Sequence, residues 1–186
     1  MEYKVNVRVS NRHVHLTKET FGKLFDGEIE KDYDLNQIGE FASKQFLTIN
    51  YNGIRIPNVR VLGQFRDYNQ VEISKRDARG LKCNPPVRSS GVLDDALFVT
   101  LETPKGSVTT KALIIADRHV HMSPDDAIKY GVLDKQKVKV RIPGDKSGVM
   151  DAVIKVGTTG YYEFHVDTDD ANAFLIEDND EVTLII

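Results

Sequence analysis

Ser10-Asn11-Arg12-His13-Val14-His15-Leu16-Thr17 is the stretch on which the organisation of this 186-residue chain depends. Its pattern recurs as Ala116-Asp117-Arg118-His119-Val120-His121-Met122-Ser123. On an extended chain, side chains two residues apart point to the same side, so each His-x-His pair directs two imidazoles to one place. Both imidazoles of a pair can then bind one metal ion. A duplicated fold with a duplicated metal site accounts for both copies.

A strand precedes each histidine tract and a capped helix follows it. The alternating valines of residues 5–9 predict the first strand, and the apolar run 112–115 predicts the second. Thr17 is an expected N-cap for a short helix, and Ser123 starts another. Both tracts therefore lie where a strand turns into a helix.

Short apolar runs separated by turn residues make up most of the remaining sequence. Asn52-Gly53 is a strong hairpin signal. We expect strands at 46–51, 54–57, 59–63, 71–74, 97–101, 137–142, 150–156, 161–166 and 182–186, helical turns after Ser74 and over 169–174, and irregular structure over 32–40. The pattern predicts a mainly β protein with short helices.

The internal repeat extends beyond the tracts to two further pairs of segments: 56–63 with 150–157, and 71–78 with 164–171. The second pair places Glu72 opposite His165. Each half of the chain therefore supplies a His-x-His pair and one more ligand-type side chain from an equivalent strand.

These side chains form two unequal candidate metal sites. The first half offers two histidines and a carboxylate: His13, His15 and Glu72. The second offers three histidines: His119, His121 and His165. Together the sets use all five histidines of the chain. Three protein ligands leave one coordination position open, as catalytic zinc sites do.

Simpler interpretations stay open for single residues. A lone histidine is more often an ordinary surface or core residue than a ligand, and Glu72 also fits a solvated strand. Arg66 has a planar guanidinium that suits phosphate, or it is an ordinary loop arginine. Cys83 has no counterpart in the repeat, which favours a non-catalytic thiol. Two His-x-His pairs with matched third donors nevertheless favour metal binding.

Composition excludes several classes of function. Lys and Arg number 25 against 28 Asp and Glu, and the net charge of −3 gives no basic excess for nucleic acid or an anionic membrane. A single cysteine excludes an intrachain disulfide framework and fits a reducing compartment. The first residues lack the apolar core of a signal peptide, and no stretch approaches the ~20 apolar residues of a membrane span. We therefore expect a soluble, cytoplasmic protein.

Taken together, these motifs resemble those of the PduL-type phosphotransacylases, the phosphate propanoyltransferase family associated with propanediol degradation and bacterial microcompartments. The resemblance covers essentially the whole chain. It rests on the motifs within 10–16, 63–74, 87–91, 118–122 and 164–173.

The resemblance implies transfer of a short acyl group between coenzyme A and orthophosphate, at a two-zinc site between two small β-barrels. It also implies that the barrels exchange their first strands, giving domains of residues 1–12 with 115–186 and of residues 13–114. The metal ligands carried over are the same six that the repeat indicates. Arg66 matches the phosphate-binding arginine of the family. Four residues fall where the family contacts coenzyme A: Ser10, Arg60, Leu62 and Asn172.

The chain departs from the family's pattern in three places. Gln64 stands where the family usually has proline, which bears on the path of the Arg66 loop. Ser89 stands where the family has aspartate, which puts a loop ion pair with Arg88 in doubt. The chain also begins at its first strand, without the amphipathic extension of encapsulated members. We expect an unencapsulated form or one recruited by other means.

Two other functions remain open on the residues alone. A metal-dependent hydrolase also uses His-x-His, and an open zinc activates water, although barrel hydrolases of that kind have about 250 residues and do not need the motif twice. A metal-stabilised binding module would have two closed sites. Because every histidine is assigned to metal, we expect direct transfer rather than an acyl-enzyme. The oligomeric state is left open, a homodimer included.

Overall fold

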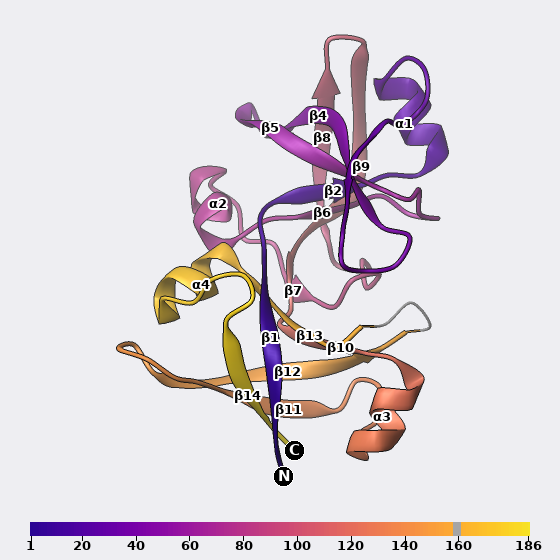
Figure 1. Ribbon diagram of the computed structural model, residues 1–186. Helices are drawn as coiled ribbons and strands as arrows, with labels where there is room; N and C mark the ends of the chain where they lie inside the picture. The colour runs from indigo at the N-terminus through magenta and orange to yellow at the C-terminus, as the bar shows by residue number, and fades with distance from the viewer. Residues whose placement is uncertain (158–160) are drawn as a thin grey trace. The chain divides into compact units, whose positions relative to one another are not determined.

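The computed structural model describes residues 1–157 and 161–186 and is mainly β (Figure 1). The four helices within these residues contain six or seven residues each. The elements in chain order are β1 (Glu2–Ser10), β2 (His13–His15), α1 (Lys18–Leu24), β3 (Lys31–Asp34), β4 (Phe41–Tyr51), β5 (Ile54–Gly63), β6 (Gln70–Glu72), α2 (Lys75–Gly80), β7 (Val87–Arg88), β8 (Leu97–Thr103), β9 (Gly106–Ala116), β10 (His119–Met122), α3 (Pro124–Tyr130), β11 (Lys137–Ile142), β12 (Gly148–Val156), β13 (Glu163–Asp167), α4 (Thr168–Phe174) and β14 (Glu181–Ile185).

The chain divides into two compact units, and each contains a closed barrel. The unit of residues 1–11 and 117–186 has the strand order β1-β13-β10-β12-β11-β14, closed by pairing of β14 with β1. In the unit of residues 12–116 the order is β4-β5-β2-β6-β9-β8, closed by pairing of β8 with β4. The predicted mainly β fold with two small barrels is confirmed.

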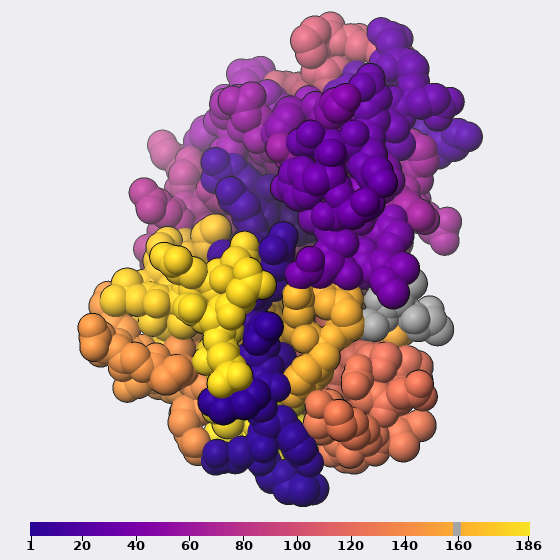
Figure 2. Space-filling model, in the orientation of Figure 1, coloured from indigo at the N-terminus to yellow at the C-terminus, as the bar shows by residue number. Residues whose placement is uncertain are grey.

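The barrels exchange the first strands of the two sequence repeats. β1 precedes the first histidine tract but pairs with β13 and β14 of the C-terminal part. In the space-filling view, the indigo residues of β1 accordingly lie beside yellow and orange residues (Figure 2). β9 precedes the second tract but pairs in parallel with β6 of the first half. This exchange is the one that the resemblance to the phosphotransacylase family implied.

Each barrel encloses its own apolar core. Val5 and Val7 of β1 contribute to the core of the first unit, together with Val120 and Phe164. Val14 and its neighbours on β5 and β6 contribute to the core of the other. Inward side chains alternate with outward ones along barrel strands, so a buried central valine sends the flanking histidines outward. Full burial of one such valine contributes about 1.5–3 kcal/mol.

The predicted N-caps are confirmed. Thr17 accepts a hydrogen bond from the backbone of Thr20 at the start of α1, and Ser74 does the same for Asp77 in α2. Ser123 and Asp126 form a reciprocal capping box at the start of α3, which ends at Gly131 with a φ of 67°. Such caps satisfy backbone N–H groups that the first helical turn leaves without partners.

Two predicted stretches of secondary structure are wrong. Residues 32–40 were expected to be irregular, but Lys31–Asp34 form β3, which pairs with β4. Every residue of β3 is exposed, so the sequence has no apolar alternation there. Residues 54–57 and 59–63 were expected as separate strands, but β5 runs through both. The register with β4 shifts near Asn58, whose φ is 58°, so this residue forms a bulge rather than a break.

The predicted register between 56–63 and 150–157 is off by one residue. His13 lies beside Arg60, and His119 lies beside Val153, so Arg60 and Val153 are the equivalent positions. The sequence pattern had instead placed Arg60 over Ile154, which is 1% exposed. Because a slip of one residue reverses the face of every side chain, that pairing would equate an outward position with an inward one.

None of the helices in the two described ranges has the length and apolar character needed to cross a membrane.

Candidate functional site

The first histidine tract and Glu72 come together on the outer face of their barrel. β2 and β6 pair antiparallel, with His13 opposite Glu72. The ligand atoms of His13, His15 and Glu72 lie within 4.8 Å of one another. His13 Nε2 is 3.5 Å from Glu72 Oε2. Val14 and Val71 on the same two strands belong to the core, which is why the ligand-type side chains share the opposite face.

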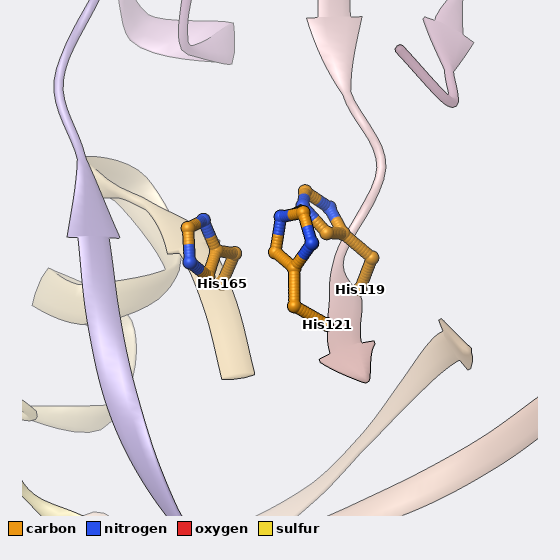
Figure 3. A group of neighbouring side chains, drawn as sticks. All are labelled: His119, His121 and His165. Carbon is orange, nitrogen blue, oxygen red and sulfur yellow. Dashed lines mark hydrogen bonds between the residues drawn. The ribbon is translucent and has the colours of Figure 1, made fainter. Parts of the chain in front are cut away.

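The second histidine tract repeats this arrangement with three imidazoles. β10 and β13 pair antiparallel, with His119 opposite His165. The ligand atoms of these two residues and of His121 lie within 4.8 Å of one another, and the Nε2 atoms of His119 and His121 are 3.1 Å apart. Figure 3 shows the ring of His165 facing the two rings from β10. The structure thus brings together the three side chains of each predicted group.

Burial favours the neutral form of two imidazoles of the second group, those of His119 and His165. Burial, followed by repulsion from His165 and Lys155, lowers the pKa of His119 to about 3. Burial also lowers the pKa of His165, although the hydrogen bond with Glu163 opposes this effect. A neutral imidazole has a nitrogen lone pair available for a metal ion, whereas a protonated one has none.

A backbone contact orients one of these rings. His119 Nδ1 lies 2.8 Å from the carbonyl oxygen of Asp117. When Nδ1 carries the proton and donates it to that carbonyl, the lone pair is on Nε2, the atom nearest His121. Metal-ligating histidines commonly use their second nitrogen in this way.

The donor atoms of both groups fit zinc. Two imidazoles with a carboxylate, and three imidazoles, are both ligand sets that zinc accepts. Softer thiolate-dependent metals are disfavoured, because neither group contains a cysteine. In each group the protein supplies three ligand side chains, which is the number typical of a catalytic rather than a structural zinc site.

Arg66 lies in the loop after β5, in the same unit as the first group. The exposed fraction of its side chain is 19%, and its guanidinium donates to Glu40 at 3.0 Å and to Tyr68 and Ser90 at 3.3 Å each. Burial alone would lower the pKa of Arg66, but the hydrogen bond to Tyr68 and the charges of Glu40 and Glu72 raise it. The guanidinium therefore remains positively charged.

The backbone of this loop is held close to the first tract. The backbone N–H of Arg66 donates to the carbonyl of Leu16 at 2.9 Å. At the start of the loop, a Cβ atom on Gly63 would lie 2.1 Å from Cζ of Phe41, so only glycine allows this approach. The peptide bond from Gly63 to Gln64 is cis.

Two of the four residues expected at coenzyme A lie beside the first group of predicted ligands. Arg60 and Leu62 lie on β5 directly beside His13 and His15. The structure therefore brings these two residues together with the predicted ligands. The guanidinium of Arg60 also lies over two aromatic rings and forms an ion pair of 2.8 Å: its partners are Tyr33, Phe46 and Asp32.

The other two expected residues belong to the unit of the second group. Ser10 ends β1 and pairs with Asp167 of β13. Asp167 caps α4, and Asn172 is exposed on that helix. Ser10 therefore lies beside the N-cap of α4, and Asn172 lies in the second half of the same helix.

Arg88 and Cys83, which the sequence analysis also considered, have structural roles. Arg88 at the end of β7 forms an ion pair with Asp95 in the loop that follows, which supplies the partner that Ser89 does not. The thiol of Cys83 lies 3.6 Å from the carbonyl of Ala78, and burial raises its pKa. The thiol is therefore protonated at neutral pH, in agreement with a non-catalytic role.

Sequence reasoning missed several residues that touch the predicted ligands, and two of them occupy matching positions. Gln70 donates to Glu72, and Glu163 lies 3.4 Å from His165. Each precedes the third ligand of its group by two residues and therefore shares its face of the strand. That spacing was the available signal, but it does not show that the side chains are in contact.

Comparisons with known proteins cover both barrels. A family model described as phosphate propanoyltransferase matches residues 6–177. The phosphate propanoyltransferase of Thermotoga maritima is 46% identical over 184 residues, covering 96% of this chain and 88% of the relative. Relatives of the same name from Rhodopseudomonas palustris and Priestia megaterium are 38% and 43% identical, covering 98% and 95% of this chain and 82% and 83% of theirs. This chain therefore belongs to the phosphate propanoyltransferase family, a family of acyltransferases.

Proposed function

We propose that this protein transfers a short acyl group between coenzyme A and orthophosphate, so that acyl-coenzyme A and phosphate give acyl phosphate and coenzyme A, and that each barrel holds one zinc ion. Family membership supports the reaction class. The observation that carries the metal assignment is the pair of three-residue ligand groups on equivalent strands of the two barrels.

The six proposed ligands are His13, His15 and Glu72 in one barrel, and His119, His121 and His165 in the other. Bound zinc would supply a Lewis acid that polarises the thioester carbonyl and stabilises the thiolate of coenzyme A. The remaining tasks, which are binding and orienting the two substrates, belong to the side chains around the ligands.

Arg66 is proposed to bind phosphate. Its guanidinium keeps its charge and is fixed by three side chains, so little conformational entropy is lost when the anion binds. Its backbone contact with Leu16 places the loop next to the strand that carries His13 and His15. The contacts with coenzyme A that the resemblance implies are assigned to Ser10, Arg60, Leu62 and Asn172.

The proposed chemistry is a direct displacement. A phosphate oxygen forms a bond to the thioester carbonyl carbon, the carbon–sulfur bond breaks, and the sulfur leaves as a thiolate. Transfer by way of a covalent acyl-enzyme would instead require a nucleophilic side chain of the protein. The histidines are assigned to metal, and the raised pKa of Cys83 keeps its thiol protonated. Trapping of an acylated side chain after mixing with acyl-coenzyme A alone would overturn direct transfer.

The first test is thiol release from propionyl-coenzyme A with and without phosphate. Propionyl-coenzyme A is the donor to try first, because the family that this chain resembles is associated with propanediol degradation. Release that depends on phosphate supports transfer. Release without phosphate instead supports a metal-dependent hydrolase, and no release supports a binding module.

Arg66→Ala tests the phosphate role directly. Loss of a charged donor that holds a reacting anion costs about 100-fold in kcat/KM, so we expect a drop of that order for phosphate with both zinc ions retained. Arg55→Ala is the matched control, because Arg55 is an exposed arginine of the same barrel paired with Glu102. Full phosphate-dependent activity in the Arg66 variant would show that the assignment is wrong.

A further inference from the structure

Gln70 is a buried polar residue between the proposed ligands and the Arg66 loop. Its exposed fraction is 0%. It lies on β6 opposite His15 and shares an outward face with Glu72. Burying an amide without hydrogen-bond partners costs about 1–3 kcal/mol, so a fully buried glutamine needs defined contacts at both ends of its amide.

Both ends of the Gln70 amide are used. Nε2 donates to Glu72 Oε1 at 2.5 Å and to Ser90 Oγ at 2.9 Å. Oε1 accepts from the backbone N–H of Gly91 at 2.7 Å. The side chain is therefore held by the loop that contains Ser90 and Gly91 while it binds the carboxylate of Glu72.

These contacts give the two oxygens of the Glu72 carboxylate different neighbours. Oε1 accepts from Gln70, whereas Oε2 lies 3.5 Å from His13 Nε2. The amide thus fixes the rotation of the carboxylate with one oxygen turned towards the histidine. A carboxylate oriented in this way binds a metal through a single oxygen, and less side-chain freedom is lost when the ion arrives.

The same hydrogen-bond path reaches Arg66. Ser90 Oγ accepts from Arg66 Nη1 at 3.3 Å as well as from Gln70. One continuous path therefore runs from Glu72 through Gln70 and Ser90 to Arg66. Its ends are a proposed metal ligand and the proposed phosphate-binding group.

The other barrel has a carboxylate at the equivalent position, although the shortest contact of His165 Nε2 there is the hydrogen bond of 2.9 Å with the hydroxyl of Tyr161. Glu163 lies opposite His121, as Gln70 lies opposite His15, and its Oε2 is 3.4 Å from His165 Nε2. The chemical types are complementary in both copies. An amide N–H faces a carboxylate ligand in one barrel, and a carboxylate faces an imidazole ligand in the other.

We propose that Gln70 is a positioning residue that orients Glu72 as a metal ligand and couples it to Arg66 through Ser90, and that Glu163 is its counterpart beside His165. This inference rests on the proposed function, since it assumes that Glu72 binds metal and Arg66 binds phosphate. Gln70 itself touches neither substrate in this account.

The metal arm of the test is zinc affinity measured by chelator competition in the full chain. A His119→Ala/His121→Ala background removes the second ligand group, so the measured zinc affinity is that of the first group alone. There, Gln70→Met is expected to weaken zinc binding by about 10–100-fold, the usual cost of losing such an outer partner. Gln45→Met is the matched control, because Gln45 is in the same barrel and its amide contacts the backbone of residues 28 and 30.

Gln70→Asn guards against a variant that simply fails to fold. Its shorter side chain stays polar but cannot span from Glu72 to Ser90, so the same loss is expected. In the reciprocal His13→Ala/His15→Ala background, Glu163→Gln is expected to weaken zinc at the second group. Zinc affinity in a folded Gln70 variant equal to that of its His119→Ala/His121→Ala parent would overturn the inference.

The coupling to Arg66 is tested by phosphate kinetics on the otherwise unchanged enzyme. Ser90→Ala breaks the path but leaves the bond from Gln70 to Glu72, so we expect a several-fold higher KM for phosphate with zinc content unchanged. A purely structural role for Ser90 would change thermal stability without this KM effect, and that result would overturn the coupling.

Measurements on the wild-type protein distinguish failure of the proposed function from failure of the positioning role alone. If the wild type binds no zinc and releases no thiol in response to phosphate, the proposed function fails. If it does both, and the Gln70 variants match their parent proteins in zinc affinity and in phosphate KM, the positioning role alone fails.

Discussion

The two proposed ligand groups differ by one charge. His13, His15 and Glu72 carry a carboxylate, whereas the second group consists of three imidazoles. A divalent ion would retain a larger net positive charge among three neutral ligands than beside a carboxylate. The second group is therefore better suited to stabilising a thiolate, and the first to a site shared with Arg66 and phosphate. Under the proposed function, the two metals would therefore have different roles.

Protonation of His119 gives a prediction for the metal-free protein. The pKa of His119 is lowered to about 3, below the 6.5 of an unperturbed histidine. As the pH falls from about 6.5 towards 3, the unfolded chain binds a proton that the folded chain does not, so stability is lost over this window and is fully present above it. Urea midpoints between pH 7 and pH 4 should fall more steeply for the wild type than for His119→Gln. Equal pH dependence of the two proteins would contradict the shift.

At the scale of elements, each ligand group has an ion pair that joins the start of its histidine strand to the helix after its other strand. Arg12 directly precedes His13, and its guanidinium lies 2.8 Å from Asp77 in α2, the helix after β6. Arg118 directly precedes His119 and lies 2.7 Å from Asp170 in α4, the helix after β13. The repeat therefore preserves a clamp, formed by Arg12–Asp77 in one barrel and Arg118–Asp170 in the other.

Exchange of the charges tests whether this clamp supports the ligands. Partly exposed ion pairs are worth about 0.2–1 kcal/mol, so Asp77→Asn should weaken zinc binding at the first group by at most about five-fold. The double variant Arg12→Asp/Asp77→Arg should recover part of that loss, whereas Arg141→Ala, which breaks an exposed pair with Glu2, should have no effect. If Asp77→Asn lowers only the melting temperature, the clamp is structural alone.

Elements with a local pattern were predictable from the sequence. The alternation before His13, the caps at Thr17 and Ser123 and the hairpin at Asn52-Gly53 all depend on neighbouring residues, and the structure has them. The repeat also placed Glu72 over His165, and both side chains lie with their histidine pairs.

Other features depend on distant contacts and could not be predicted. The exposed edge strand β3 has no apolar residues facing a core. The register of β5 shifts at a bulge, which pattern matching cannot locate. The role of Gln70 depends on Ser90 and Gly91, about twenty residues away along the chain but in hydrogen-bond contact in the fold.

At the scale of the whole molecule, the duplication provides two closed barrels that each carry a core and a ligand group of their own. Ring closure leaves the barrel strands of each unit without open edges, which protects them from pairing with other chains. Because each group is built from strands of a single barrel, the two should load zinc separately. His119→Ala/His121→Ala should therefore retain one zinc per chain by elemental analysis. A loss of both ions would contradict separate loading.

The central claim is that two zinc ions per chain support transfer of an acyl group to phosphate. The most direct test is thiol release and acyl phosphate formation from propionyl-coenzyme A, measured with zinc content, before and after chelation. We predict two zinc ions per chain, equal amounts of thiol and acyl phosphate that require phosphate, loss of both products on chelation, and recovery when zinc is restored. Thiol release that persists without phosphate, or full activity in the zinc-free protein, would contradict the account.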